Sequence, residues 1–307
     1  MTPERIEQLK SEKDVVMLVH NYQRPEIQDV ADFLGDSLNL AMEATKVSQS
    51  TILFCGVDFM AESAKILNPE KTVLHPNTEA KCPMAAMIDI DGLRKLKEEH
   101  PEAVVVAYVN TTAETKTLTD ICCTSANAVN VVKQLSAGEI IFIPDANLGL
   151  YVQRFIPDKK FIFWPGYCHV HRDVTPEDVQ SMKDSHSNAK VLVHPECAPP
   201  VIDMADEVLS TEGMVRFSKS SDFSEFIIVT ERELSYRLQK ENPGKTFHIL
   251  ERAICPAMKK ITMDDVLKCL ESGRPEIELP ESVIEQAKLP LERMLTISRG
   301  EKLKDKL

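Results

Sequence analysis

Residues 166–171 read GYCHVH and place Cys168, His169 and His171 within four positions of one another. Thiolate and imidazole groups at such short spacing are typical ligands of zinc and other transition metals. The chain has eight cysteines, but no two of them form a C-x-x-C pair, so the sequence holds no zinc-ribbon or ferredoxin-type motif. If Cys168 binds a metal, its partner ligands must come from distant parts of the chain.

The partners can be found in an internal repeat, in which three apolar runs each end in polar residues: VMLVHNY, VVVAYVN and KVLVHPE. Three residues are equivalent in this alignment: His20, Tyr108 and His194. A cysteine follows each of them at an offset of 62, 60 or 61 residues: Cys82, Cys168 and Cys255. The repeat therefore predicts one site built from three cysteines. The alternative is a triplicated fold with three unrelated buried cysteines, since buried free cysteine is common.

Other positions coincide in the same alignment and suggest what surrounds the cysteines. Two residues after the first set come Tyr22, Asn110 and Glu196. Seventeen residues after it come Ser37, Ser125 and Thr211. Lysines recur after three aligned prolines and are expected to be turn residues rather than phosphate binders: Lys71, Lys159 and Lys245. The first two sets are rich in groups that move protons or form hydrogen bonds.

Each unit is expected to form a strand, a helix, a strand, a helix, a strand and then the loop with the cysteine. The short continuous apolar runs are typical of strands that are buried on both faces of a parallel sheet. The predicted fold class is α/β, with three small α/β layers related by pseudo-threefold symmetry. The expected domains are 1–87, 88–174 and 175–260, and the C-terminal helices of 261–307 are expected to pack back on the body.

This architecture would bring the polar residues together. Ligands of open parallel sheets lie beyond the carboxyl ends of the strands, where the residues of the first two sets are expected. Ser37, Ser125 and Thr211 are expected at helix starts, with Ser37 as an N-cap. Helix N-termini offer free N–H groups and a positive dipole end, which suit carboxylate or phosphate. Capping accounts for part of the role of these hydroxyls, and three converging helix starts would also suit a substrate with several anionic groups.

Composition limits the possible partners of this 307-residue chain. The net charge of −12 and the pI of about 5.2 argue against nucleic acid and against anionic membrane surfaces, because no basic excess remains to neutralise phosphates. The N-terminus is charged and helix-like rather than a signal peptide. The longest apolar run, AVVVAYV, is too short to span a bilayer. We therefore expect a cytoplasmic protein whose cysteines are thiols, metal ligands or nucleophiles.

Three thiolates leave two metal centres open. They could bind zinc with water as the fourth ligand, or three corners of a [4Fe–4S] cluster whose fourth iron is open to substrate. Ligation by cysteine alone favours the cluster, and an open iron would act as a Lewis acid. Two other function classes are a zinc hydratase or aldolase with three thiolate ligands, and a cluster-based redox or oxygen sensor that is not an enzyme.

The chain resembles the quinolinate synthase A family over essentially its whole length. Ordered motifs carry the resemblance: VHNYQRPEIQDVADFLGDSLNLA, GVDFMAESAKILNP, CPMA, YVNTTAETK, TSANAV, PDANLG, CHVH, VHPEC, STEGM and AICPAMKK. The resemblance implies three pseudo-symmetric three-layer α/β domains in a triangular arrangement around a central metal cluster, which is one oxygen-sensitive [4Fe–4S] cluster. It also implies condensation of iminoaspartate with dihydroxyacetone phosphate to quinolinate in de novo NAD synthesis. The expected upstream partner, in transient contact at most, is an aspartate oxidase or dehydrogenase.

The resemblance also implies a role for each candidate residue. The cluster ligands would be Cys82, Cys168 and Cys255. The residues expected to act in catalysis are His20, Tyr22, Tyr108, His171, His194 and Glu196, of which Tyr22, His171 and Glu196 are the candidates for general acid–base chemistry. His20 and His194 would assist with charge and hydrogen bonds to the anions. The residues expected to bind substrate are Ser37, Asn110, Ser125 and Thr211.

Overall fold

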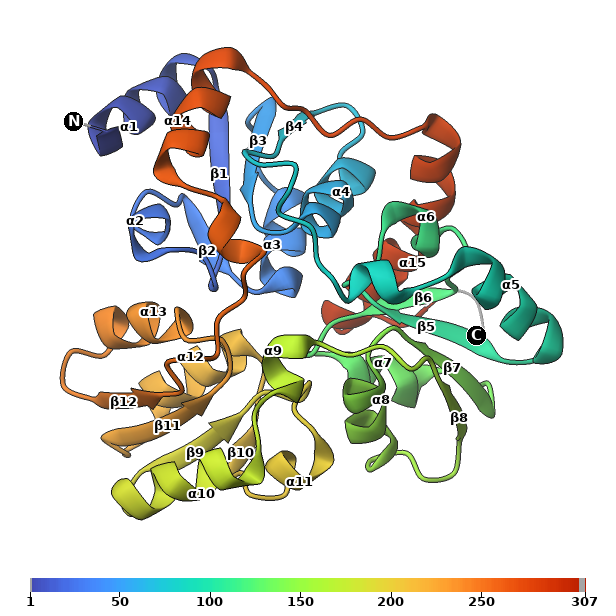
Figure 1. The fold of residues 1–307 in the computed structure, drawn as a ribbon. Coiled ribbons are helices and arrows are strands. Elements are labelled where there is room, and N and C mark those ends of the chain that lie inside the picture. The colour runs from blue at the N-terminus through green and yellow to red at the C-terminus, as the bar shows by residue number, and fades with distance from the viewer. Residues whose placement is uncertain (1, 304–306) are drawn as a thin grey trace.

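The computed structural model describes residues 2–303 and residue 307. Figure 1 shows three α/β lobes at the corners of a triangle, in blue, green and yellow-orange along the chain. Each lobe contains one four-stranded sheet with helices on both sides. The predicted fold class is therefore confirmed. The four strands of each sheet fall within one of the three expected domains, whereas the exact boundaries at residues 87, 174 and 260 stay a prediction.

The three domains repeat one order of elements. The first domain has α1 (Thr2–Glu12), β1 (Val15–His20), α2 (Pro25–Gln28), β2 (Phe33–Gly35), α3 (Ser37–Ala44), β3 (Thr51–Cys55), α4 (Asp58–Leu67), β4 (Thr72–Leu74) and η1 (Ala85–Met87). The second has α5 (Ile90–Glu99), β5 (Val104–Tyr108), α6 (Ala113–Lys116), β6 (Ile121–Cys123), α7 (Ala128–Gln134), β7 (Glu139–Ile143), α8 (Ala146–Gln153), β8 (Lys160–Phe163) and α9 (His169–Arg172). The third has α10 (Pro176–Ser185), β9 (Lys190–Val193), α11 (Pro199–Ile202), β10 (Glu207–Val208), α12 (Thr211–Ser220), β11 (Glu225–Val229), α13 (Leu234–Glu241), β12 (Thr246–Ile249) and η2 (Met258–Lys260).

All three sheets are parallel and share one strand order. The orders are β2-β1-β3-β4, β6-β5-β7-β8 and β10-β9-β11-β12. In the first sheet, for example, Leu18 pairs with Phe33 on one side and with Phe54 on the other. The expectation of three strands in each unit is wrong, because each sheet has a further edge strand: β2, β6 or β10. These edge strands are two or three residues long, too short to show hydrophobic periodicity.

The central strands divide their side chains between two cores. Along β11, Phe226 and Ile228 enter one buried cluster, while Ile227 and Val229 enter another. Successive side chains of a strand point to opposite faces, so both faces of the sheet are covered by helices. This explains why the strands read as continuous apolar runs rather than alternating ones. The cysteines outside the predicted site belong to these cores: Cys55, Cys122, Cys123, Cys197 and Cys269.

The two C-terminal helices pack back on the first and second domains. Helix α14 (Met263–Ser272) packs beside α1 of the first domain, and α15 (Glu281–Ser298) packs against α4 of the first domain and against α6 and β6 of the second. Helices were expected in this part of the chain, residues 261–307. Within the described residues, no helix combines the length and the hydropathy that crossing a membrane requires.

The three recurrent lysines have the same structural role in each domain. The ammonium group of Lys71 donates to the carbonyl of Val47, just after α3. Lys159 donates to the carbonyls of Leu135 (2.9 Å) and Ala137 (2.5 Å), just after α7. Lys245 likewise binds carbonyl groups at the end of α12. A cation at a helix C-terminus satisfies carbonyls that have no partner within the helix, so these lysines stabilise the fold rather than bind phosphate.

We expect Lys159→Met to lower the stability of the protein by about 1–2 kcal/mol, because two carbonyls lose a charged donor. For a chain of this size, that corresponds to a fall of a few degrees in melting temperature. The adjacent Lys160→Met is the matched control, since its ammonium group pairs with Glu139 at the surface and is 66% exposed. We expect this control to change stability by less than about 0.5 kcal/mol. Equal melting temperatures for the two variants would contradict the prediction.

Candidate functional site

A cavity of about 70 Å³ lies where the three domains meet, near α9 at the centre of the triangle in Figure 1. Its wall contains residues of all three domains. The structure brings every residue that the sequence predicts for the site onto this wall: His20, Tyr22, Ser37, Cys82, Tyr108, Asn110, Ser125, Cys168, His171, His194, Glu196, Thr211 and Cys255. The triplicated pattern therefore marks one composite site rather than three separate ones.

The first strand of each domain positions a histidine or tyrosine of the site at its carboxyl end. His20 and Tyr108 are the last residues of β1 and β5, and His194 directly follows β9. In parallel sheets the carboxyl ends of these strands are where a ligand site forms. Two residues further along each chain segment, the turn carries the second set into the same cavity: Tyr22, Asn110 and Glu196.

The residue that caps the N-terminus of helix α3 differs from the predicted one. Asp36, and not Ser37, is the N-cap of α3, because its Oδ1 accepts a hydrogen bond from the Asn39 amide at 2.9 Å. Ser37 is the first residue of that helix. Thr211 is likewise the first residue of α12, whereas Ser125 lies in the turn that precedes α7. An aspartate directly before the serine takes the capping role, since both residue types are strong N-caps.

Each candidate ligand cysteine lies beside a short helical turn. Cys82 precedes η1, Cys168 is the N-cap of α9 and Cys255 precedes η2. Burial raises the pKa of the Cys82 thiol to about 12 and raises the pKa of Cys168 and Cys255, while N–H groups of the following turn oppose this rise. Cysteine sulfurs that accept N–H hydrogen bonds are typical of Fe–S sites, and metal coordination would deprotonate them. The donor set therefore fits such a cluster.

The positions of the three sulfurs can be compared with those that a single zinc ion would require. Three thiolates on one tetrahedral zinc ion, with Zn–S bonds of ~2.3 Å, lie about 3.8 Å from one another. In the part of the chain that the structure describes, the sulfurs of Cys82, Cys168 and Cys255 are not a group whose members all lie within 4.8 Å. The three sulfurs are therefore not placed as three thiolates on a single zinc ion are.

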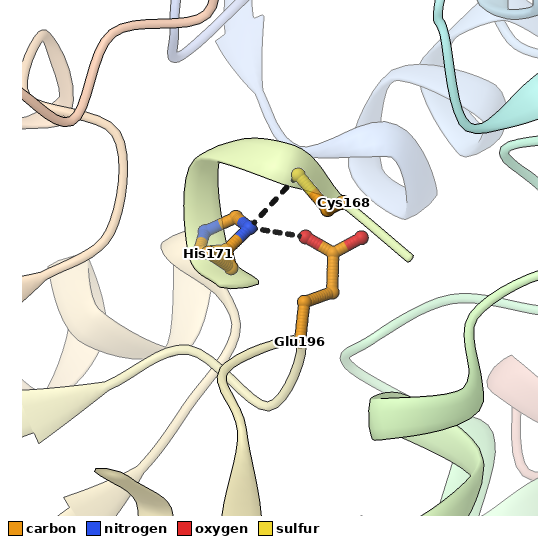
Figure 2. A group of neighbouring side chains, drawn as sticks. All are labelled: Cys168, His171 and Glu196. Carbon is orange, nitrogen blue, oxygen red and sulfur yellow. Dashed lines mark hydrogen bonds and ion pairs between the residues drawn. The ribbon is translucent and has the colours of Figure 1, made fainter. Parts of the chain in front are cut away.

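His171 connects a candidate ligand to a carboxylate (Figure 2). Its Nδ1 lies 3.2 Å from the Cys168 sulfur and 2.7 Å from Oε2 of Glu196. The ligand atoms of these three residues lie within 4.8 Å of one another, so they also form a compact thiolate, imidazole and carboxylate set that a zinc ion could bind. Metal analysis is therefore needed to separate a zinc-bound form from a cluster-bound one.

The other nitrogen of His171 extends this contact into a chain of hydrogen bonds. His171 Nε2 lies 2.8 Å from Oγ1 of Thr230, and the same hydroxyl lies 2.6 Å from the phenol oxygen of Tyr22. Tyr22, Thr230, His171 and Glu196 are thus linked in sequence across all three domains. Thr230 is almost fully buried and directly follows β11. The sequence reasoning missed it, although its place at the carboxyl end of a strand was a usable signal.

The electrostatics of the cavity assign protonation states to these groups. Burial by itself raises the pKa of Glu196, but the neighbouring His171 and the hydrogen bonds of His171 and His194 outweigh burial and lower it. Burial and the nearby Glu196 charge raise the pKa of Tyr22 well above its ordinary value. Burial lowers the pKa of His194 and, with help from the Lys259 charge, lowers that of His20 to about 3. At neutral pH the site therefore holds an ionised Glu196, a protonated Tyr22 and a neutral His20 and His194.

The neutral state of His20 gives a prediction for acid stability. Between pH 3 and 6.5 the unfolded chain binds a proton at His20 that the folded chain does not bind. Stability is thus greatest above the unfolded pKa of about 6.5 and falls as the pH approaches 3. We expect melting temperatures of metal-free protein to fall with pH in this range, and to fall less steeply in His20→Asn, which keeps an acceptor for the Tyr22 N–H. Equal slopes for both proteins would contradict this assignment.

Two polar atoms of the site lack partners. Oδ1 of Asn110 and Oε1 of Glu196 are buried, and no hydrogen bond to either is found among the described residues. Leaving a buried polar atom unpaired costs about 1–3 kcal/mol. Both atoms belong to residues of the cavity wall. The arrangement is therefore that of a site whose hydrogen bonds are completed by a bound molecule.

Known proteins match this chain along nearly all of its length. The family model described as "Quinolinate synthetase A protein" matches residues 4–296. The quinolinate synthase of Methanoregula boonei is 51% identical over 96% of this chain and 97% of its own. Those of Thermodesulfovibrio yellowstonii and Aquifex aeolicus are 48% and 47% identical, over 96% and 95% of this chain and 98% and 93% of their own. The family assignment removes the sensor alternative, since the relatives are synthases. The chain therefore belongs to the quinolinate synthase family of enzymes.

Proposed function

We propose that this chain condenses iminoaspartate with dihydroxyacetone phosphate to quinolinate, with loss of phosphate and water, as a step of de novo NAD biosynthesis in the cytoplasm. The family assignment supports this proposal. The observation that carries it is the composite cavity, in which three cysteines share one wall with Tyr22, His171 and Glu196. Thr230 links Tyr22 to His171 by hydrogen bonds, and His171 pairs with Glu196. The unpartnered oxygens of Asn110 and Glu196 supply hydrogen-bond sites for the substrates.

The proposed cofactor is a [4Fe–4S] cluster held by Cys82, Cys168 and Cys255. When bound, it would supply an iron with an open position, a Lewis acid that polarises a substrate oxygen and assists the loss of hydroxide as water. The cysteines are partly buried on the cavity wall and their sulfurs accept N–H hydrogen bonds, which supports this assignment. Among the described residues, the three sulfurs do not all lie within 4.8 Å of one another, as three thiolates on one zinc ion would, which favours the cluster over a zinc hydratase or aldolase.

The chain's own residues would move the protons of the condensation. Tyr22 keeps its proton at neutral pH and can donate it, while the ionised Glu196 can accept one. Thr230 and His171 lie between them at hydrogen-bond distances, so a proton removed at one end can be replaced from the other. Formation of an imine and rearrangement of a carbonyl both require such transfers, and a positioned acid or base typically contributes about 10²–10⁴-fold.

Neutral groups would bind the anionic parts of the substrates. Among the described residues, no lysine or arginine lines the cavity. Hydroxyl, amide and imidazole groups are available instead, in Ser37, Asn110, Ser125, Thr211 and the neutral His20 and His194. Nδ1 of His20 accepts the Tyr22 N–H at 3.1 Å, so its Nε2 carries the proton and is the donor. Tyr108, which stays protonated because burial raises its pKa, would orient the intermediate.

The test is metal and product analysis of protein purified without oxygen. Roughly four irons and four sulfides per chain, together with quinolinate formed from iminoaspartate and dihydroxyacetone phosphate, are the expected results. About one zinc per chain without sulfide would overturn the cluster assignment. A loaded protein that forms no quinolinate would overturn the substrate assignment. Iminoaspartate is to be generated in the assay by an aspartate oxidase or dehydrogenase, the class of enzyme proposed as upstream partner.

A further inference from the structure

A carboxylate binds the backbone of each candidate ligand cysteine. Oδ1 of Asp58 accepts the Cys82 N–H at 3.1 Å. Oδ2 of Asp145 accepts the Cys168 N–H at 3.2 Å, and Oε1 of Glu231 accepts the Cys255 N–H at 3.1 Å. The separations along the chain are 24, 23 and 24 residues, so the contact recurs at the same place in each domain.

The same carboxylates are fixed at the start of the helix that follows the third strand of each domain. Asp58 is the first residue of α4 and accepts the Phe59 N–H at 2.9 Å. Asp145 is the N-cap of α8 and accepts the Leu148 N–H at 2.9 Å. Glu231 lies just before α13 and accepts the Glu233 N–H at 2.9 Å. Each side chain therefore ties a cysteine loop to a helix that is packed in the domain core.

We propose that Asp58, Asp145 and Glu231 are positioning residues for the metal centre, each holding its cysteine at the spacing that the three thiolates need. The inference rests on the proposed function, because it assumes that the three cysteines share one metal centre. No strand or helix lies between β4 and η1, so the Cys82 segment has no regular element to hold it. Asp145 and Glu231 are fully buried. Burying carboxyl groups is costly, and their recurrence beside all three cysteines indicates a shared role.

Asp58 offers the cleanest test, because one of its oxygens makes both contacts. Oδ1 accepts the N–H groups of Phe59 and Cys82, so the carbonyl oxygen of Asp58→Asn can keep both bonds, whereas Asp58→Ala loses both. We expect Asp58→Ala to release iron to a chelator at least about fivefold faster than wild type, and Asp58→Asn to stay within about twofold. Rescue by asparagine would separate hydrogen bonding from charge.

A second readout does not depend on the cluster or on activity. Cd²⁺ added to metal-free protein gives an ultraviolet thiolate charge-transfer band, which reports thiolates that can share a metal. We expect the band to be weaker at equal Cd²⁺ in Asp58→Ala, normal in Asp58→Asn and strongly reduced in Cys82→Ala. Asp32→Ala is the matched control, since Asp32 accepts the Met17 N–H at 2.7 Å in the same domain but binds no cysteine loop. We expect this control to lower the melting temperature and leave the band unchanged.

The outcomes separate the two proposals. If wild-type protein holds no iron or sulfide and its Cd²⁺ band is unaffected by Cys82→Ala, the shared metal centre is wrong, and the inference fails with it. If wild type is loaded but Asp58→Ala retains iron and Cd²⁺ binding as wild type does, only the positioning role is overturned. If Asp32→Ala weakens the band as much as Asp58→Ala, the effect is general destabilisation and the inference is likewise overturned.

Discussion

Cys168→Ala, purified without oxygen, is expected to retain less than about a tenth of the wild-type iron and sulfide and to form no detectable quinolinate. Cys168 provides one of three thiols on the cavity wall, and no other cysteine of the described chain lines that wall besides Cys82 and Cys255. A cluster with two protein ligands would lose the third anchor that holds it in place. The same loss is expected for Cys82→Ala and Cys255→Ala, because each domain supplies one ligand.

Cys197→Ala is the control for this prediction. Cys197 directly follows Glu196 in the sequence, yet its side chain is fully buried in the core of the third domain, and burial raises the pKa of its thiol. We expect this variant to keep its iron and sulfide and to lose only a little stability. A wild-type cluster content in Cys168→Ala, or a loss as large in Cys197→Ala, would show that the ligands are assigned wrongly.

The repeat explains how much of the site could be predicted. Residues such as His20 and Tyr108 stand at the ends of apolar runs that are long enough to identify as strands. All three units show the same apolar run, the same helix start and the same cysteine. Several positions together therefore fixed the alignment of the three units. Parallel strand ends then bring these positions together without any knowledge of side-chain packing. This is why every predicted site residue lines the cavity.

What the sequence did not reveal depends on contacts between domains or on very short elements. Thr230 matters because it lies between Tyr22 of the first domain and His171 of the second. Its place after a strand was visible in the sequence, but its contacts with the other two domains were not. Strand β10 has two residues, whereas alternation of apolar and polar residues is recognised over about four to eight residues. The choice of Asp36 over Ser37 as N-cap is a competition between adjacent good caps, which propensity alone does not decide. Neutral His20 and His194 likewise result from burial that only the assembled fold creates.

Tyr22→Phe and Glu196→Gln are each expected to lower kcat by about 10²–10⁴-fold while the iron and sulfide content stays normal. Phenylalanine removes the phenol that lies 2.6 Å from the Thr230 hydroxyl. Glutamine keeps the size of Glu196 but removes the charge that the two neighbouring histidines stabilise. Single-turnover product formation, measured beside metal content, separates loss of proton transfer from loss of the cofactor. Near-normal turnover in both variants would show that the acid–base assignment is wrong.

The substitutions at Thr230 decide whether these two residues act through one chain. Thr230→Ser keeps the hydroxyl between Tyr22 and His171, whereas Thr230→Val keeps the shape and removes it. If protons pass along the chain, the valine variant should approach the loss seen in Tyr22→Phe, and the serine variant should stay near wild type. Tyr236→Phe, which removes a phenol that binds Asp29 at the surface, controls for loss of a tyrosine hydroxyl as such. Equal activity in the valine and serine variants would mean that Tyr22 and Glu196 exchange protons with substrate or solvent independently.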